Sequence, residues 1–273
     1  MPSVILAVVE RPETAVRVLA AAGTLAELTS SAQINVLAIR TPPIATIQPT
    51  EQIMTPGYAA QIRAQEQART EVLQNDFRAW SEAAAATDVV TEWLDVEELA
   101  AVALAKLGRR ADYIVLKRPW DHMPQPERQA ILGALFETDR PVLVVPPDTP
   151  SAPFGRRVAI AWREDERTNR AALSALRLLS LAERVFVLAG APAESPLRPP
   201  EFFKEHGVAA ELHILQLSRQ RAFGEALLAK AHELGADMLV MGAYVHQPLV
   251  RLVLGGVTRY MLTHADIPVL MRH

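Results

Sequence analysis

Short, nearly continuous runs of apolar residues alternate along the whole chain with longer amphipathic segments. The runs are rich in Val, Ile and Leu, which is typical of strands buried on both faces of a parallel sheet. The expected strands are residues 4–9, 34–39, 89–94, 111–117 and 142–145 in the first half of the chain, and 157–162, 185–189, 209–215, 236–241 and 267–271 in the second.

The segments between these runs are predicted helices, because their apolar residues recur about every 3.6 positions. Val16, Leu19 and Leu25 follow this spacing in the first of them. The alternation of strands and helices predicts a doubly wound α/β architecture. The expected helices are residues 13–28, 61–86, 96–107, 169–181, 219–233 and 250–262.

The two halves of the chain look like copies of one unit. The sequence Ala-Asp-Tyr-Ile-Val-Leu at 111–116 matches Ala-Asp-Met-Leu-Val-Met at 236–241, and Pro-Val-Leu recurs at 141–143 and 268–270. An internal repeat of this kind predicts two domains, residues 1–148 and 155–273, joined by a proline-rich linker. The first copy carries an insertion, which holds a proline-rich loop over residues 41–57 and a long helix.

Composition excludes several classes of function. The 273 residues have a net charge of −3, which is unfavourable for non-specific binding to nucleic acid or acidic membranes. The absence of cysteine removes disulfides and thiolate chemistry. No apolar run approaches the ~18 residues of a membrane span. An acidic Glu10 follows the first apolar run and no basic segment precedes it, so we expect a first strand, not a signal peptide, and a cytoplasmic location.

No set of residues predicts catalysis. The seven histidines form no metal-binding signature, and the sequence contains no nucleophile elbow, no phosphate loop ending in Gly-Lys-Ser/Thr and no dinucleotide motif. The chain is therefore expected to be neither an enzyme nor a metalloprotein.

Candidate binding residues follow the strands of the second half. Parallel sheets bind ligands at the carboxyl ends of their strands. Gly255 and Gly256 precede a helical stretch, so their part of the backbone offers amide donors and a helix dipole to a phosphate, and Thr258 is expected to add a hydroxyl. Gly242 is expected to leave its strand in a conformation closed to other residues. The candidate set is Ala161, Ala189, Met241, Gly242, Gly255, Gly256, Val257 and Thr258.

These glycines carry a family resemblance. In universal stress proteins a strand ends in Gly, and two residues, Gly, nine residues, and then Gly with Ser or Thr follow; a terminal Pro-Val-Leu strand comes later. Gly242 and Gly255 occupy the first and third glycine positions, and residues 264–270 match the family's ending. The chain thus resembles a tandem universal stress protein.

The resemblance implies a fold, a ligand and partners. It implies two domains, each a five-stranded parallel sheet in the order 3-2-1-4-5 flanked by helices. It implies ATP or ADP as ligand, with or without Mg²⁺, and action through an unidentified protein partner. Family members pair through their last strands, so residues 142–145 and 267–271 are expected at the interface of an internal pseudo-dimer, while further homodimerisation is left open.

Departures from the family pattern weaken this expectation. Val245 stands at the second glycine and Gly256 at the Ser/Thr position. Trp162 occupies the place where nucleotide-binding members usually carry Asp, and we expect it to fill space rather than to stack on adenine. In the first half, Lys117-Arg118-Pro119-Trp120 replaces the glycine loop, so no nucleotide is expected there. Lys117 and Arg118 are interpreted as solvated charge, with a relic anion-binding patch as the alternative.

Three functions remain open from the sequence. The first is a non-catalytic stress protein that binds a nucleotide or another small ligand in its C-terminal domain. The second is a scaffold that has lost nucleotide binding, in which the glycines serve only turns and close packing. The third, and the least favoured, is a nucleotide hydrolase with weak ATPase activity.

Overall fold

The computed structural model describes residues 3–46, 55–84, 88–118, 125–147, 153–190, 200–215, 222–246 and 253–273. The chain divides into two compact units, Met1–Arg140 and Pro141–His273, which we call the N-terminal and C-terminal units. Each is described by itself below.

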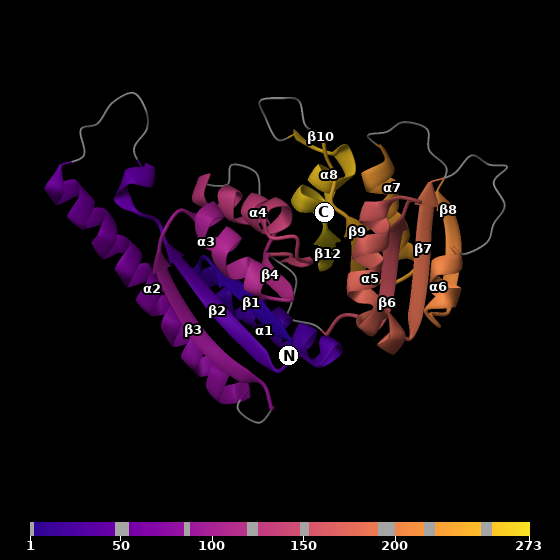
Figure 1. Cartoon of the computed structure of the whole chain (residues 1–273), viewed down its shortest axis with the longest axis horizontal. Coiled ribbons are helices and arrows are strands. Elements are labelled where there is room, and N and C mark those ends of the chain that lie inside the picture. Colours follow the sequence, from indigo (N-terminus) through magenta and orange to yellow (C-terminus); the bar gives the residue numbers. More distant parts are fainter. Residues whose placement is uncertain are drawn as a thin grey trace. The chain divides into compact units, whose positions relative to one another are not determined.

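The N-terminal unit is built on a parallel sheet with the strand order β3-β2-β1-β4. Helices α1 and α2 pack on each other, and so do α3 and α4. Helix α2 is long and runs beside β2 and β3 (Figure 1). The elements are β1 (Val4–Val9), α1 (Pro12–Thr29), β2 (Gln33–Arg40), the 3₁₀ turn η1 (Pro43–Thr46), α2 (Pro56–Ala84), β3 (Val90–Glu97), α3 (Ala100–Leu107), η2 (Gly108–Arg110), β4 (Tyr113–Lys117) and α4 (Gln125–Glu137).

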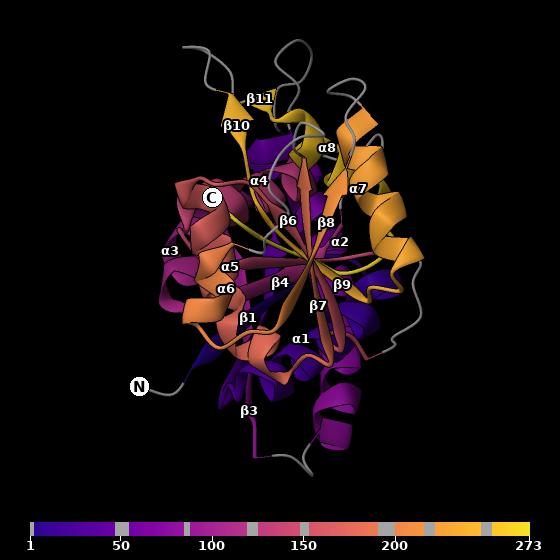
Figure 2. The ribbon, with the colours of Figure 1, turned by 90° about the vertical axis from the view of Figure 1, so that its right-hand side faces the viewer.

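The C-terminal unit has five parallel strands in the order β8-β7-β6-β9-β12. Figure 2 shows α5 and α6 on one side of these strands and α7 and α8 on the other. The elements are β5 (Val142–Val145), β6 (Arg157–Trp162), α5 (Glu166–Leu181), β7 (Arg184–Gly190), α6 (Glu201–Glu205), β8 (Ala210–Leu215), α7 (Ala222–Glu233), β9 (Met238–Gly242), β10 (Val245–His246), β11 (Val253–Leu254), α8 (Gly256–His264) and β12 (Val269–Arg272).

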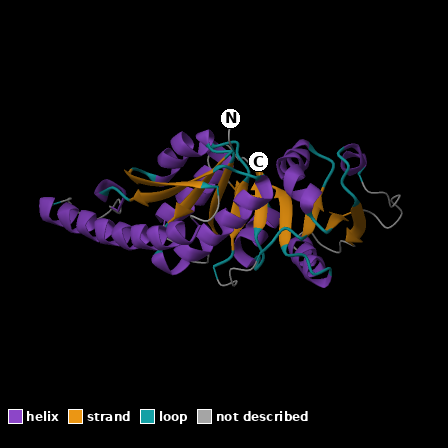
Figure 3. Ribbon diagram, turned by 90° about the horizontal axis from the view of Figure 1, so that it is seen from below, coloured by secondary structure: helices purple, strands orange, loops and turns teal. Residues whose placement is uncertain are grey.

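Both units are therefore α/β layers with a parallel-dominated sheet, as the sequence predicts. Helices lie on both sides of the strands when the molecule is seen from below (Figure 3). The central strands are buried along their length, as shown by β1 from Ile5 to Val9 and by β9 from Met238 to Gly242. This burial on both faces explains their continuous apolar runs.

The boundary between the units differs from the predicted one between 148 and 155. Strand β5 pairs antiparallel with β12, with Val144 opposite Val269 and Val142 opposite Met271. Because of this pairing β5 belongs with the C-terminal unit, and the division falls at Arg140. The N-terminal unit consequently holds four of its five expected strands, and the C-terminal unit gains an antiparallel one. The pairing joins the two segments predicted for the pseudo-dimer interface, and the pseudo-dimer itself stays a prediction.

Individual residues at the helix ends determine where α1 and α5 begin after the strands that precede them. Helix α1 begins at Pro12, whose fixed φ suits the first turn. It ends at Thr29 and is capped by Ser30, which adopts a left-handed conformation and donates its N–H to the Ala26 and Glu27 carbonyls. In the C-terminal unit Asp165 caps α5 by accepting a hydrogen bond from the Thr168 N–H at 2.9 Å. Both helices thus start directly after the carboxyl end of a central strand.

Several boundaries depart from the sequence expectation. The strands at 4–9 and 157–162 have the predicted limits. Helix α5 starts at Glu166, three residues before the predicted start. Helix α8 starts only at Gly256, because the residues just before it pair as the hairpin of β10 and β11. Part of the proline-rich loop, residues 47–54, lies outside the described residues.

Among the helices of the described segments, none has the length and apolar character needed to cross a membrane.

Candidate functional site

A cavity of about 660 Å³ opens in the C-terminal unit where β6 and β9 end. Seven of the eight predicted residues line it: Ala161, Met241, Gly242, Gly255, Gly256, Val257 and Thr258. Ala189 does not. It lies on β7 opposite Trp162, one strand away from the cavity. The carboxyl ends of two neighbouring strands therefore bring most of the predicted set together, although residues 161 and 258 are far apart in sequence.

The N-terminus of α8 faces this cavity. Gly255 is the N-cap residue and has no side chain to cap the helix. The N–H of Arg259 donates to the Gly255 carbonyl, but the N–H groups of Gly256, Val257 and Thr258 have no acceptor among the described residues. Arg163 and Arg259 also line the cavity, and the guanidinium of Arg163 pairs with Asp165 at 3.0 Å. The arrangement suits an anion, since amide donors, helix dipole and cations all favour negative charge.

Gly242 and Gly255 are required for close packing rather than for an unusual backbone. Neither has a positive φ, so the predicted special conformation of Gly242 is wrong. A Cβ at Gly242 would lie 3.0 Å from the Tyr244 ring and 3.2 Å from Arg167. A Cβ at Gly255 would lie 3.1 Å from the Cβ of Tyr244. A Cβ at Gly256, by contrast, meets nothing within 4 Å. Tyr244 therefore leaves little room for a side chain at positions 242 and 255, whereas position 256 has open space for one.

Tyr244 is the centre of a network that the sequence analysis missed. Its hydroxyl donates to the Asp165 carboxylate at 2.7 Å and lies 2.9 Å from the hydroxyl of Thr168. Its ring contacts the guanidinium groups of Arg163 and Arg167 at 5.3 and 5.5 Å from the ring centre. The network ties the start of α5 to the loop after β9. The only sequence signal for it was an Asp immediately before the first turn of a helix.

The electrostatics of this network hold Asp165 ionised. Burial works to raise the pKa of Asp165, but hydrogen bonds from Thr168 and Tyr244 and the charge of Arg163 outweigh it and keep the pKa below its usual value. Burial raises the pKa of Tyr244 to about 12, and its hydrogen bond to the Asp165 carboxylate adds to this effect. Tyr244 is consequently a neutral donor at physiological pH, and Asp165 is committed to a structural role.

Thr258 has a role that the sequence did not predict. The residue is 0% exposed, and its hydroxyl accepts a hydrogen bond from the Tyr244 N–H at 2.9 Å. The hydroxyl therefore holds the loop after β9 against α8. Its predicted contact with a phosphate stays a prediction.

Replacing Thr258 with valine is expected to lower the free energy of unfolding by about 1–2 kcal/mol, because the Tyr244 N–H loses its acceptor. Urea denaturation of both proteins measures the difference. Thr258→Ser keeps the hydroxyl and should recover most of the loss; if the serine variant is as unstable as the valine variant, the hydrogen bond is not the cause.

Trp162 closes one side of the cavity. Its ring centre lies 5.0 Å from that of Phe203 and 5.7 Å from that of Phe202, and the residue is only 8% exposed. These contacts with α6 agree with the space-filling role expected for Trp162.

The N-terminal unit contradicts the prediction that Lys117 is solvated. Lys117 is 2% exposed and forms an ion pair with Glu127 at 3.0 Å. Burial lowers the pKa of Lys117, although the charges of Glu10 and Glu127 oppose this effect. The sequence could not reveal the burial, because Glu127 comes from the following helix α4. Pro119 and Trp120 lie outside the described residues.

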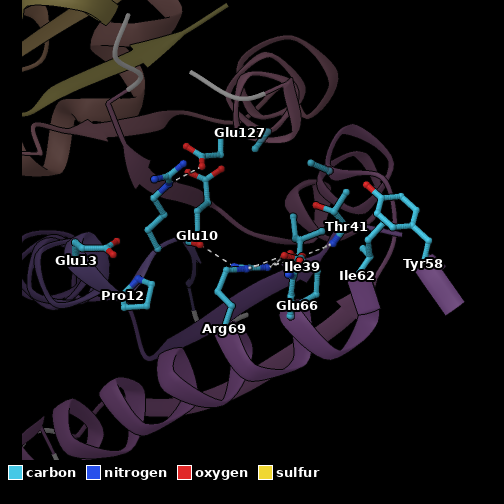
Figure 4. Close-up of a pocket in the computed structure, with 14 residues that line it drawn as sticks. Glu10, Pro12, Glu13, Ile39, Thr41, Tyr58, Ile62, Glu66, Arg69 and Glu127 are labelled. Atoms are coloured by element: carbon cyan, nitrogen blue, oxygen red, sulfur yellow. Dashed lines mark hydrogen bonds and ion pairs between the residues drawn. The ribbon is translucent and has the colours of Figure 1, made fainter. Parts of the chain in front are cut away.

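Nearby, a second cavity of about 560 Å³ opens at the carboxyl ends of β1 and β2 (Figure 4). Glu10, Arg69 and Glu127 are among its lining residues. Burial raises the pKa of Glu10 to about 8, with a further increase from Glu127 and opposing effects from Lys117, Arg69 and Arg11. The two units therefore present cavities of opposite character: amide donors and arginines in one, and an unusually basic carboxyl in the other.

The fold makes the C-terminal unit a doubly wound α/β domain, and its cavity lies at the carboxyl edge of the sheet, where domains of this class bind ligands. Residues 140–273 match the model of the Universal stress protein family, and this part of the chain belongs to that family. No curated protein matches the sequence significantly.

Solved structures extend the similarity of fold to the whole chain. A universal stress protein from Archaeoglobus fulgidus DSM 4304 is 14% identical with a TM-score of 0.69, covering 98% of this chain and 97% of that one. A putative universal stress protein from Pseudomonas aeruginosa UCBPP-PA14 is 16% identical with a TM-score of 0.60, covering 99% and 93%. The cytoplasmic domain of a prokaryotic cation chloride cotransporter is 14% identical with a TM-score of 0.52, covering 99% and 95%. Because these structural alignments cover both units, they fit a tandem arrangement of two similar domains.

Proposed function

We propose that the C-terminal unit binds ATP or ADP without turning it over, and that the chain is a cytoplasmic stress protein that acts through a protein partner. The observation that carries the proposal is the first turn of α8, where the N–H groups of Gly256, Val257 and Thr258 have no acceptor among the described residues and these residues line a cavity together with Arg163 and Arg259. Phosphate groups complement both the dipole and the charge of this wall.

Magnesium would reach this site with the nucleotide. None of the described residues that line the cavity is acidic, and Mg²⁺ needs oxygen ligands, which phosphates and water supply. The Asp165 carboxylate, which belongs to the Tyr244 network, already accepts hydrogen bonds from the Tyr244 hydroxyl and the Thr168 N–H. The same commitment means that the Asp165 carboxylate is not free to act as a general base.

A thermal-shift titration with ATP and Mg²⁺ tests binding, because a ligand of the folded state raises the melting temperature. Gly256 offers the sharpest variants, since a side chain there has open space. Gly256→Glu places a carboxylate beside the amides and should abolish the shift. Gly256→Ser introduces the hydroxyl expected at this position in the family and should preserve or increase it.

The two variants are expected to change the thermal shift in opposite directions. If the glutamate variant keeps the full shift, the phosphate does not bind at α8. A flat response of the wild-type protein up to millimolar ATP would instead support the scaffold function, and a turnover assay that detected phosphate release abolished in the glutamate variant would support the hydrolase.

A further inference from the structure

The cavity of the N-terminal unit lies at the topological switch point of its sheet. The order β3-β2-β1-β4 places successive strands on opposite sides of β1. Glu10 directly follows β1, Thr41 follows β2, and Lys117 ends β4. Open α/β sheets bind ligands at such a point, in the crevice beyond the carboxyl ends of the strands.

The cations around this cavity are held by the protein itself. Arg69 donates to both oxygens of Glu66, at 3.2 and 2.9 Å, and to the carbonyls of Glu10 and Ile39, each at 2.7 Å (Figure 4). Arg11 donates to Glu127 at 2.7 Å, and Lys117 pairs with the other oxygen of Glu127 at 3.0 Å. Each positive group near the cavity thus has an internal anionic partner, so the wall is a poor receptor for phosphate or carboxylate.

The carboxyl of Glu10 is in the opposite situation. No described residue donates a hydrogen bond to it, although it lines the cavity. Glu13 also lines the cavity, from the first turn of α1, and is exposed. The remaining wall is largely apolar and includes Ile39, Ile62 and Ala130. The cavity therefore combines an acceptor in need of a donor with a surface that suits a hydrocarbon stem.

We propose that this cavity binds a small organic cation, an ammonium or guanidinium group on a short alkyl stem, with the Glu10 carboxylate as its charge partner and the apolar wall around the stem. The Glu66 carboxylate does not compete for this role, because it already accepts hydrogen bonds from Arg69 and from the Thr41 N–H at 2.7 Å. The site is separate from the proposed nucleotide site, so either can fail without the other.

Binding of such a cation is coupled to a proton. Burial raises the pKa of Glu10 to about 8, so the carboxyl is largely protonated near neutral pH. The groups that face it are Lys117 on β4, Glu127 on α4, Arg69 on α2 and the neighbouring Arg11. A bound cation favours the ionised carboxylate, and Glu10 must release its proton as the ligand enters.

Calorimetric titration of the full chain with n-butylammonium and n-butylguanidinium, compared with n-butanol and butyrate, tests the charge requirement. The two cations are expected to bind more tightly than the uncharged and anionic probes by at least about tenfold. Repeating the titration near neutral pH in buffers of different ionisation enthalpy should reveal close to one proton released per cation bound. The comparison of the two cations distinguishes ammonium from guanidinium.

Glu10→Gln keeps the shape of the side chain and removes its charge. It should weaken cation binding by at least about tenfold and abolish proton release. Glu13→Gln removes an equal charge from the same cavity and should change the affinity by less than about threefold. Amide hydrogen exchange of β1 and β4 in both variants verifies that the unit remains folded. Equal binding of butanol and butylammonium, no binding of either cation at millimolar concentration, or unchanged binding by folded Glu10→Gln would each overturn the proposal.

Discussion

Replacing Lys117 with methionine is expected to lower the free energy of unfolding of the N-terminal unit by about 3 kcal/mol, because it leaves the Glu127 carboxylate, whose side chain is only 12% exposed, with less compensating charge. Lys117 is 2% exposed and its ammonium lies 3.0 Å from the Glu127 carboxylate. Methionine has a similar length and fills the same space, so the decrease in the free energy of unfolding comes from the lost charge and not from a cavity. Hydrogen exchange of β4 peptides in increasing urea assigns the change to this unit.

Lys106→Met is the matched control. Lys106 also pairs with a glutamate at 3.0 Å, but its side chain is 66% exposed. Exposed pairs contribute about 0–1 kcal/mol, so this variant should be nearly neutral. Equal effects of the two substitutions would mean that burial of Lys117 has no energetic consequence.

Raising the pH is expected to destabilise the N-terminal unit through Glu10. Burial raises the pKa of Glu10 from 4.5 to about 8, so the folded state holds a proton that the unfolded state has lost. The stabilisation is complete below pH 4.5 and is lost as the pH rises to about 8. Each pH unit within this window costs about 1.4 kcal/mol, and the total is on the order of 5 kcal/mol.

Glu10→Gln should remove this dependence. The variant's free energy of unfolding should exceed that of the wild type by an amount that grows with pH across the window and levels off above it. Urea denaturation at several pH values, read by hydrogen exchange of β1 peptides, measures the difference. A constant difference between the two proteins from pH 4.5 to about 8 would show that Glu10 titrates normally in the folded state.

The fold could be predicted from local patterns because its strands are buried on both faces. The limits of β1 and β6 coincide with their apolar runs, since nothing polar interrupts a central parallel strand. The hairpin of β10 and β11 could not be predicted, because two-residue strands are too short to show a period. The apolar residues of β11 were consequently included in the following helix.

Only those residues of the candidate site that belong to a sequence motif could be predicted. Gly242 and Gly255 mark the cavity, yet the reason for them is the Tyr244 ring and not the backbone angle that the sequence suggested. The network of Tyr244, Asp165 and Thr258 joins three distant segments, so no spacing along the chain reveals it. Burial of Lys117 was missed for the same reason, because its partner Glu127 comes from the next helix.

The most direct test of the central claim is the amide NMR spectrum of the ¹⁵N-labelled protein during titration with ATP and Mg²⁺. If the first turn of α8 binds phosphate, the amide signals of Gly256, Val257 and Thr258 move together and saturably, while that of Gly23 in α1 stays in place. Unmoved signals at these three amides up to millimolar ATP, or saturable shifts confined to other residues, would contradict the account.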